Sequence, residues 1–409
     1  MLTLRSFIKE EQNVHMEHVE DLIFNEGVDG TRRAINFLRD LRDMLAGNST
    51  SKVTATVKWD GAPAVFAGVD PRDGKFFVAK KGVFNKEPKV YKTEADIDAD
   101  TQGDLAVKLK VALAEFKKLG IKSGVYQGDL MFTAADLKKE TIDGNDYITF
   151  HPNTIVYAVP FDSALGRQIR SAKVGVVWHT TYTGDSFETM RASFGQPITP
   201  HMKVTSSVWM DDANYKDYSG TATFTQAETK QVTDMLAQAG RMFNAISART
   251  LNAISQDPDL LSLVKTYNNT KVRAGQRINP VEHVKGLFNY IFDKFQKEIA
   301  TKKTVQGKTS QEEKRKKILA FFANHPQAEI VRIFELANLI ADIKQPIIAK
   351  MNQASHINTF VKTNTGFRVV GSEGFVAIDR LKGGAVKIVD RMEFSRNNFS
   401  PEIVKGWQR

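Results

Sequence analysis

The stretch Val53-Thr-Ala-Thr-Val-Lys-Trp-Asp-Gly61 decides how the fold of this chain is interpreted. β-Branched residues alternate with others along it, which is typical of a half-buried β-strand. Two more short apolar runs follow at residues 64–68 and 75–79, and the segment between them has the Pro and Asp-Gly chemistry of a hairpin turn. The stretch therefore predicts a β-rich core, with its lysine and aspartate at the end of a strand.

The composition is that of a soluble globular protein. The 409 residues are 42% hydrophobic and 25% charged, and no stretch approaches the roughly 20 apolar residues of a membrane-spanning helix. The first residues hold too short an apolar run for a signal peptide, so we expect a cytoplasmic protein without a membrane partner. The absence of cysteine excludes disulfides, thiolate catalysis, Fe–S clusters and cysteine-based zinc sites. The net charge of +10 favours a polyanionic partner, most simply nucleic acid.

Hydrophobic periodicity separates helical from strand-rich segments. Apolar residues recur at helical spacing over residues 5–46, with a loop at 25–30, and again over 104–119, where Gly120 is the expected stop. Further along, the pattern predicts strands at 124–132, 154–160 and 174–180, irregular structure at 190–222, helices over most of 225–355, and strands again over the last fifty residues.

These changes of pattern predict four consecutive parts. A small-polar linker at residues 47–51 is the clearest boundary. The expected parts are an N-terminal helical segment (1–48), the first part of the core (49–190), a mainly helical insertion (191–360) and the closing strands of the core (361–409).

Several short charged motifs recur at the ends of the predicted strands. A single Lys-x-Asp-Gly is common by chance, and a solvated strand end is its plain interpretation. The whole ordered set has no such simple explanation. It consists of Lys58-Trp-Asp60-Gly61, Lys80-Lys81-Gly82, Gly128-Asp129-Leu130, Glu373-Gly-Phe-Val376 and Val386-Lys387-Ile388.

This ordered set resembles the covalent nucleotidyltransferases, a superfamily of ATP-dependent DNA ligases, RNA ligases and mRNA capping enzymes. The RNA ligases of large phages are the most similar, and the stretches 58–68 and 76–81 look like uncharacterised proteins of tailed phages. The resemblance covers roughly residues 50–190 and 360–409. It implies an α+β fold with a ligase-type core of antiparallel sheets and flanking helices, into which a large helical insertion is placed. For a phage protein, the expected location is the host cytoplasm.

The resemblance assigns the reacting groups. It implies that Lys58 is the lysine that becomes nucleotidylated, with Asp60 orienting the site and Gly61 permitting the turn. Lys387 matches the lysine that contacts the α-phosphate, and it is catalytic together with Lys58 and Asp60. A lysine amine must be unprotonated to attack phosphorus, so neighbouring cations or a metal must lower its pKa.

The resemblance also assigns the groups that bind the nucleotide and the metal. It implies that Lys80 or Lys81 contacts the nucleotide, and that Asp129 and Glu373 hold Mg²⁺ or Mn²⁺ and help to bind ATP. Tyr157 is the candidate for stacking on the purine, and Trp178 is the alternative. Apart from the resemblance, His179 on a predicted core strand could face the nucleotide, but a core histidine is the preferred interpretation.

The helical insertion carries a basic cluster with few acidic neighbours. Contact with the phosphates of a nucleic acid is favoured over a merely solvated face, because the expected chemistry needs a polyanionic substrate. The cluster consists of Lys302, Lys303, Lys308, Lys314, Arg315, Lys316 and Lys317.

The preferred hypothesis is an ATP-dependent polynucleotide ligase, expected to be a monomer, that joins 3′-hydroxyl and 5′-phosphate ends of RNA or RNA/DNA strands. Two alternatives stay open: a nucleotidyltransferase that stops at lysyl-NMP transfer, and a non-catalytic nucleic-acid-binding protein on a ligase-like core. The sequence departs from the superfamily pattern in three ways. Asp129 replaces the usual Glu, the residue two positions after Lys387 is not a second lysine, and no OB-fold domain is expected after the final strands.

Overall fold

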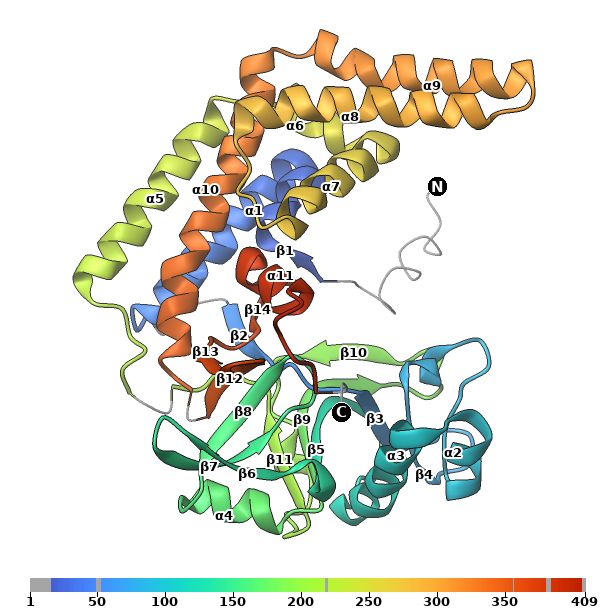
Figure 1. Ribbon diagram of the computed structural model, residues 1–409, viewed down its shortest axis with the longest axis vertical. Helices are drawn as coiled ribbons and strands as arrows, with labels where there is room; N and C mark the ends of the chain where they lie inside the picture. The colour runs from blue at the N-terminus through green and yellow to red at the C-terminus, as the bar shows by residue number, and fades with distance from the viewer. Residues whose placement is uncertain (1–15, 49–52, 218–219, 356, 380–383, 407–409) are drawn as a thin grey trace.

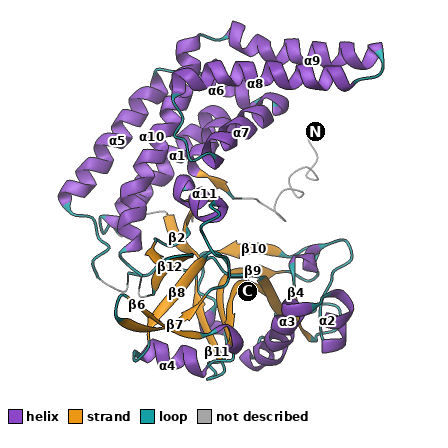
Figure 2. Cartoon of the chain, in the orientation of Figure 1, coloured by secondary structure: helices purple, strands orange, loops and turns teal. Residues whose placement is uncertain are grey.

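Helices and strands separate into two parts of the molecule, as Figures 1 and 2 show. The structure is a computed structural model that describes residues 16–48, 53–217, 220–355, 357–379 and 384–406. In this view, the helices from residues 22–45 and 226–352 form the upper part, the helix at 391–399 lies between the two parts, and most strands gather in the lower part with the helices at 94–116 and 164–171. The expected mixed α+β class with antiparallel sheets is confirmed.

The first sheet pairs strands from early and late in the sequence. Its order is β1-β15-β14-β2; β14 pairs antiparallel with both β2 and β15, and β1 pairs parallel with β15. The strands are β1 (Glu17–His18), β2 (Val53–Lys58), β14 (Gly374–Asp379) and β15 (Ala385–Ile388).

The second sheet contains the hairpin that the sequence predicts after the first strand. Its order is β10-β9-β5-β3-β4, and β11 adds to β9 in parallel. Both β10 and β11 lie in the region expected to be irregular, so that expectation is wrong for these strands. The strands are β3 (Ala64–Val69), β4 (Phe76–Ala79), β5 (Val125–Thr133), β9 (Val174–Thr183), β10 (Arg191–Phe194) and β11 (Val208–Asp212).

The third sheet is antiparallel throughout and combines strands from before and after the helical insertion. Its order is β13-β12-β8-β7-β6. The strands are β6 (Lys138–Ile142), β7 (Asn145–Phe150), β8 (Ile155–Pro160), β12 (Asn358–Thr363) and β13 (Gly366–Val369).

Small helices flank the second and third sheets. The predicted helix at 104–119 is confirmed as α3 with a short 3-10 turn, and Gly120 ends it with a positive φ of 67°. Its Phe116 packs on Trp178 of β9, with ring centroids 5.4 Å apart. The helices here are α2 (Glu94–Asp100), α3 (Gly103–Phe116) and α4 (Ala164–Ser171).

The predicted helical block is confirmed, and the N-terminal helix packs with it. One hydrophobic core joins α1, α5 to α10 and buried residues of β2, β14 and β15, so packing crosses the expected boundaries at 48 and 360. No helix among the described residues is long and apolar enough to cross a membrane. The helices are α1 (Leu22–Leu45), α5 (Gln226–Asn244), α6 (Ala248–Ser255), α7 (Pro258–Arg273), α8 (Pro280–Thr301), α9 (Val305–Asn324), α10 (Gln327–Asn352) and, after the last strand, α11 (Arg391–Phe399).

The N-terminal segment differs in detail from the expected helix over 5–46. Residues 1–15 lie outside the described part of the chain. Residues 17 and 18 form β1 rather than helix, and α1 follows after a 3-10 turn. The loop expected at 25–30 is reduced to one break, where Gly27 has a φ of 57°. A Cβ at Gly27 would lie 2.3 Å from Oδ1 of Asn252 in α6, so only glycine fits between these helices.

Candidate active site

A cavity of about 470 Å³ lies where the first and second sheets meet. Strands β2, β14 and β15 of the first sheet and β3, β5, β9 and β10 of the second supply part of its lining, and residues in the segments between strands supply the rest. The structure thus brings together segments as far apart in the chain as β2 and β15. Six of the charged side chains that the sequence singled out line this cavity: Lys58, Asp60, Lys81, Asp129, Glu373 and Lys387.

Lys58 forms an ion pair with Glu373 because the strands that position them are neighbours. Lys58 is the last residue of β2, and it pairs across the sheet with Gly374, the residue directly after Glu373. The Lys58 Nζ contacts Glu373 Oε2. Lys58 stays partly exposed, whereas the Glu373 side chain is almost buried. The amine can therefore reach a molecule in the cavity while a carboxylate touches it from the protein side.

Asp60 is a buried anchor for the turn after β2. Its Oδ1 accepts a hydrogen bond from Asn153 Nδ2 at 2.7 Å, and its Oδ2 accepts bonds from the N–H groups of Thr154 (2.7 Å) and Ile155 (2.8 Å). The Asp60 N–H donates to the Tyr157 hydroxyl at 2.7 Å. Burial raises the pKa of Asp60, and the accepted hydrogen bonds oppose that rise. Asp60 therefore ties the end of β2 to the start of β8.

Gly61 lets this turn approach β5 closely. A Cβ at Gly61 would lie 2.5 Å from the Cβ of Asp129 and 2.9 Å from the sulfur of Met131. Any larger residue would push β5 away, so the glycine brings Asp129 beside the Lys58 turn.

The carboxylates of Asp129 and Glu373 have unusual proton affinities. Burial raises the pKa of each to about 7. The positive charge of Lys58 lowers both pKa values, but by less than burial raises them, and the charge of Asp60 raises both further. Near neutral pH, each carboxyl group is therefore divided between its protonated and ionised forms. A bound cation would shift both groups towards the ionised form.

Lys387 adds a third strand-borne charge to the cavity. It lies on β15 opposite Val376 of β14. Burial lowers the pKa of Lys387, and the nearby Lys58 lowers it further. The cavity lining holds three lysines, Lys58, Lys81 and Lys387, together with three carboxyl groups, so it offers positive charges to an anionic group and oxygen ligands to a cation.

The structure distinguishes between the two adjacent lysines after β4. Lys81 lines the cavity, and its charge lowers the pKa of Asp129. Lys80 instead forms an ion pair with Asp100 of α2, with Nζ–Oδ2 at 3.0 Å, and it is not among the cavity-lining residues. Of the two, Lys81 is the residue placed to contact a ligand.

The predicted stacking residues do not face the cavity, which corrects that expectation. Tyr157 is 2% exposed, and its ring is already stacked between Trp59 and Phe150, with centroids at 5.2 and 5.3 Å. Trp178 is fully buried beneath α3. The aromatic side chains that do line the cavity are Trp59 and Phe194, and Phe194, on β10, is partly exposed.

His179 lines the cavity, so its interpretation as a core histidine is wrong. Its side chain is 26% exposed, and its Nε2 lies 3.9 Å from Asp129 Oδ2. Its Nδ1 is 2.7 Å from the hydroxyl of Thr180. Burial lowers the pKa of His179 to about 4, so the ring is neutral at pH 7. A neutral imidazole beside a carboxyl group can donate or accept a hydrogen bond.

Asp129 and Glu373 are the side chains that fit a divalent cation. Within the described parts of the chain, no group of three or more His, Cys, Asp or Glu residues could hold a metal. Mg²⁺ is often bound by one or two carboxylates together with substrate phosphates, because it keeps several oxygen ligands from water or substrate. Two carboxylates therefore suit a metal that arrives with a nucleotide better than a permanently bound one.

The basic cluster lies on α9 and the turn before it, away from the cavity lining. Two of its lysines are occupied by intramolecular ion pairs: Lys314 Nζ lies 2.7 Å from Asp259, and Lys317 Nζ lies 3.5 Å from Asp257. Arg315 lies over the ring of Phe292. The remaining members, Lys302, Lys303, Lys308 and Lys316, are exposed.

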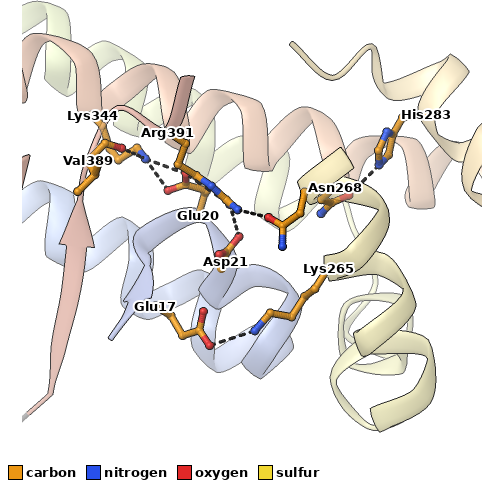
Figure 3. Close-up of polar contacts among 10 residues, drawn as sticks. Glu17, Glu20, Asp21, Lys265, Asn268, His283, Lys344, Val389 and Arg391 are labelled. Carbon is orange, nitrogen blue, oxygen red and sulfur yellow. Dashed lines mark hydrogen bonds and ion pairs between the residues drawn. The ribbon is translucent and has the colours of Figure 1, made fainter. Parts of the chain in front are cut away.

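Buried charges hold the end of β15 against the helical part (Figure 3). Lys344 of α10 donates hydrogen bonds to both carboxylate oxygens of Glu20, at 2.8 and 2.7 Å, and to the Val389 carbonyl at 2.9 Å. Arg391 donates to Asp21 at 2.7 Å. We call these five residues the clasp. Val389 comes two residues after Lys387, so the clasp connects the helices to a cavity-lining strand.

The residues missed by sequence reasoning have no local signal. Asn153 lies just before β8 and donates a hydrogen bond to Asp60. Gln127 and Phe194 reach the cavity because of how β5 and β10 are paired with β9. The three-dimensional pairing of strands is what identifies them.

Fold and cavity together define an α+β protein with a lysine- and carboxylate-lined site. The chain belongs to a family of unknown function (DUF6267), whose model matches residues 13–403. No curated protein and no solved structure matches the chain.

Proposed function

We propose that this protein is an ATP-dependent polynucleotide ligase that works through a lysyl-AMP intermediate. The observation that carries the proposal is the composition of one cavity: an accessible lysine amine beside a carboxyl group, two further lysines and a second carboxyl group. Phosphoryl transfer depends on positioning and on stabilising charge, and this lining supplies both. The cavity volume of about 470 Å³ also falls within the range of small-molecule sites.

The first step would be attack by Lys58 on the α-phosphorus of ATP. A bond forms between Lys58 Nζ and phosphorus, and the bond from phosphorus to pyrophosphate breaks. The ammonium form of Lys58 must first lose a proton, and Glu373 contacts the amine with a pKa raised to about 7. Before a cation binds, the ionised form of Glu373 is therefore able to take that proton. Lys81 and Lys387 would balance the negative charge of the phosphates.

A divalent cation bound with the nucleotide would polarise the phosphate oxygens. Asp129 and Glu373 would hold it, since oxygen ligands suit Mg²⁺ or Mn²⁺. Asp60 has a different role, because its carboxylate oxygens are already bonded to Asn153, Thr154 and Ile155. It would fix the turn from which Lys58 projects.

The later steps define the nucleic-acid substrate. AMP would pass from Lys58 to a 5′-phosphate on an RNA or DNA strand. A 3′-hydroxyl would then attack the activated phosphate, forming the phosphodiester and releasing AMP. Phe194 and Trp59 are the cavity-lining rings available to the adenine, in place of Tyr157.

The experiment is transfer of label from α-³²P-ATP to the protein with Mg²⁺, after treatment with pyrophosphate to remove any bound AMP. We expect a label that survives denaturation, is absent from Lys58→Ala and is retained by Lys80→Ala. The Lys80 variant is the matched control because it removes a neighbouring lysine outside the cavity.

Two further arms separate the alternatives. Stronger labelling from α-³²P-GTP would favour a capping-type enzyme, and a label that no 5′-phosphorylated strand discharges would favour an enzyme that stops at lysyl-NMP. No label with any nucleoside triphosphate would overturn the proposal and leave a binding protein on a ligase-like core.

A further inference from the structure

Helices α8 and α9 form an antiparallel hairpin that projects from the helical part (Figure 1). α8 packs on α7 and α10, whereas the main contacts of α9 are with α8. A hairpin attached mainly through one of its helices leaves much of its surface free for a partner.

One face of this hairpin exposes aromatic rings. Phe288 and Phe292 on α8 are 39% and 38% exposed, and their spacing of four residues places them on the same side of the helix. Phe288 meets Phe322 of α9 edge to face, with ring centroids 5.4 Å apart. Arg315 of α9 lies over Phe292 at 5.0 Å. The two helices thus form a continuous aromatic and cationic surface.

Exposed lysines extend this surface to the tip of the hairpin. Lys302 and Lys303 lie in the turn, and Lys308 is seven residues before Arg315, which places both on one side of α9. On α8, Asp293 and Glu298 fall on other sides of the helix than Phe288 and Phe292. Arg315 is partly exposed, although its Nη1 is buried against the neighbouring side chains and has no hydrogen-bond partner within the described residues. On α9, Glu312 is exposed and lies four residues after Lys308, so the same side of that helix also carries one acidic group. Against this one acid stand four basic residues, Lys302, Lys303, Lys308 and Arg315, and the face therefore combines a net positive charge with stacking surfaces.

We propose that this face binds a single strand of nucleic acid. Lysines contact phosphates without regard to sequence, and aromatic rings stack on bases. In a duplex, the faces of the bases are already stacked on one another, so exposed phenylalanines distinguish a single strand from a double helix. The inference rests on the proposed function for its biological meaning, because in a ligase the strand bound by the hairpin is the one whose end is joined. Its test is a binding measurement that needs no nucleotide transfer.

The experiment measures fluorescence anisotropy with the full-length chain and a labelled, unstructured 20-nucleotide strand, as RNA and as DNA, against the matching duplex. We expect the single strand to bind at least about tenfold more tightly than the duplex. Phe288→Ala combined with Phe292→Ala should weaken single-strand binding about tenfold or more, because stacking on both rings is lost. Duplex binding should not change.

Two matched controls use other parts of the molecule. Phe399→Ala removes a more exposed phenylalanine of α11, which also lies near an arginine, Arg273, at 5.9 Å. It should leave affinity unchanged. Replacing Lys302, Lys303 and Lys308 by alanine should lower the slope of log K against log salt by about 2, whereas replacing the exposed Lys117, Lys122 and Lys203 should not.

Three outcomes would overturn the inference. They are equal affinity for single strand and duplex, equal effects of the Phe288/Phe292 and Phe399 variants, and binding of anionic lipid vesicles in place of the strand with the same sensitivity to Phe288 and Phe292. A protein that binds the strand but takes no label from ATP would contradict the proposed function alone. A protein that takes label but binds normally without its two phenylalanines would contradict this inference alone.

Discussion

The cavity and the clasp both contain carboxyl groups that are largely withdrawn from solvent beside a lysine, yet the proton affinities of these groups differ between the two regions. In the clasp, Glu20 receives two hydrogen bonds from Lys344, and despite burial its pKa falls to about 2. In the cavity, Glu373 and Asp129 are held at a pKa of about 7, because burial outweighs the attraction of Lys58. The same residue types are therefore locked into one charge state in one region and poised between two in the other.

This difference separates charges that stabilise the fold from charges available for chemistry. A completely paired buried carboxylate has no spare capacity to bind a ligand or exchange a proton. An incompletely paired one costs stability, which is a common property of active sites. The two carboxyl groups of the clasp differ from each other. At Asp21, burial raises the pKa by more than the positive charge of Arg391 lowers it, so the pKa of Asp21 is raised whereas that of Glu20 is lowered. Neutral variants of Glu20 and of the two cavity carboxyl groups should therefore change the free energy of unfolding with opposite signs.

The largest effect should come from breaking the clasp with Lys344→Met. The change leaves the Glu20 carboxylate and the Val389 carbonyl without their buried partner, and we expect a loss of about 3–5 kcal/mol in the free energy of unfolding. Urea unfolding at pH 7 measures it. Lys350→Met on the same helix is the control, since its partner Glu228 is partly exposed and the loss should be about 1 kcal/mol. Equal losses would contradict the comparison.

In the cavity, Asp129→Asn and Glu373→Gln should each raise the free energy of unfolding at pH 8 by about 1–3 kcal/mol. Because the folded pKa lies above the unfolded value near 4, the folded state holds more protons between pH 4 and 7. The wild-type protein should therefore lose stability as pH rises through that range, and each variant should lose less.

The matched variant for that experiment is Glu20→Gln. In the wild-type protein, folding lowers the pKa of the Glu20 carboxyl group. The contribution of that group to stability is therefore present above about pH 4.5 and is lost as pH falls towards 2. Glu20→Gln should destabilise the protein at pH 8, where the cavity variants stabilise it. The Asp129 and Glu373 variants should also lose label transfer. A loss of stability at pH 8 in both regions would show that the cavity carboxyl groups are structural.

Tyr157→Phe should have a smaller effect. It removes the acceptor for the buried Asp60 N–H, which should lower the free energy of unfolding by about 1–2 kcal/mol. Label transfer from ATP should slow, because the turn carrying Lys58 loses a fixed contact, while the KM for ATP stays unchanged. Tyr147→Phe is the control, since its hydroxyl makes only a 3.5 Å contact on an exposed strand. A raised KM for ATP in Tyr157→Phe would instead support the stacking of Tyr157 on the purine.

A still smaller loss of stability is expected from Lys80→Ala, which removes a partly exposed ion pair worth about 0–1 kcal/mol. The adjacent residue, Lys81, should show the opposite pattern of effects. Lys81→Ala should leave stability as it is but raise the KM for ATP in label transfer about tenfold, because its charge lines the cavity. The two variants, measured side by side, test whether adjacent lysines have the separate roles that the structure gives them.

The sequence predicted those elements whose periodicity is strong. Residues 53–58 alternate as a strand, and the block at 225–355 repeats with the spacing of helices. Strand β6 went unpredicted because it is largely exposed and polar, and β7 because it begins with two exposed polar residues, Asn145 and Asp146, before its buried half. Strand β11 ends on two aspartates, which disfavour strands, and it is held by parallel pairing to β9.

The residues of the candidate site likewise divide into those that the sequence predicted and those that it did not. The motifs at strand ends identified the charged residues that line the cavity, because local chemistry marks them. The strand faces were assigned incorrectly, since neighbouring side chains on a strand point in opposite directions and only the pairing register says which direction is inward. Trp178 was considered for the site and His179 for the core, and the structure reverses them.

The pairing of β2 with β14 has a consequence for synthesis on the ribosome. Lys58 and its cross-strand partner Gly374 are 316 residues apart in the sequence, and at about 5–20 residues per second that separation takes roughly 15–65 s to translate. Throughout this interval, β2 lacks its neighbour in the four-stranded sheet and presents an open strand edge. The cavity is therefore among the last features that a nascent chain can complete, and the chain must protect that edge until then.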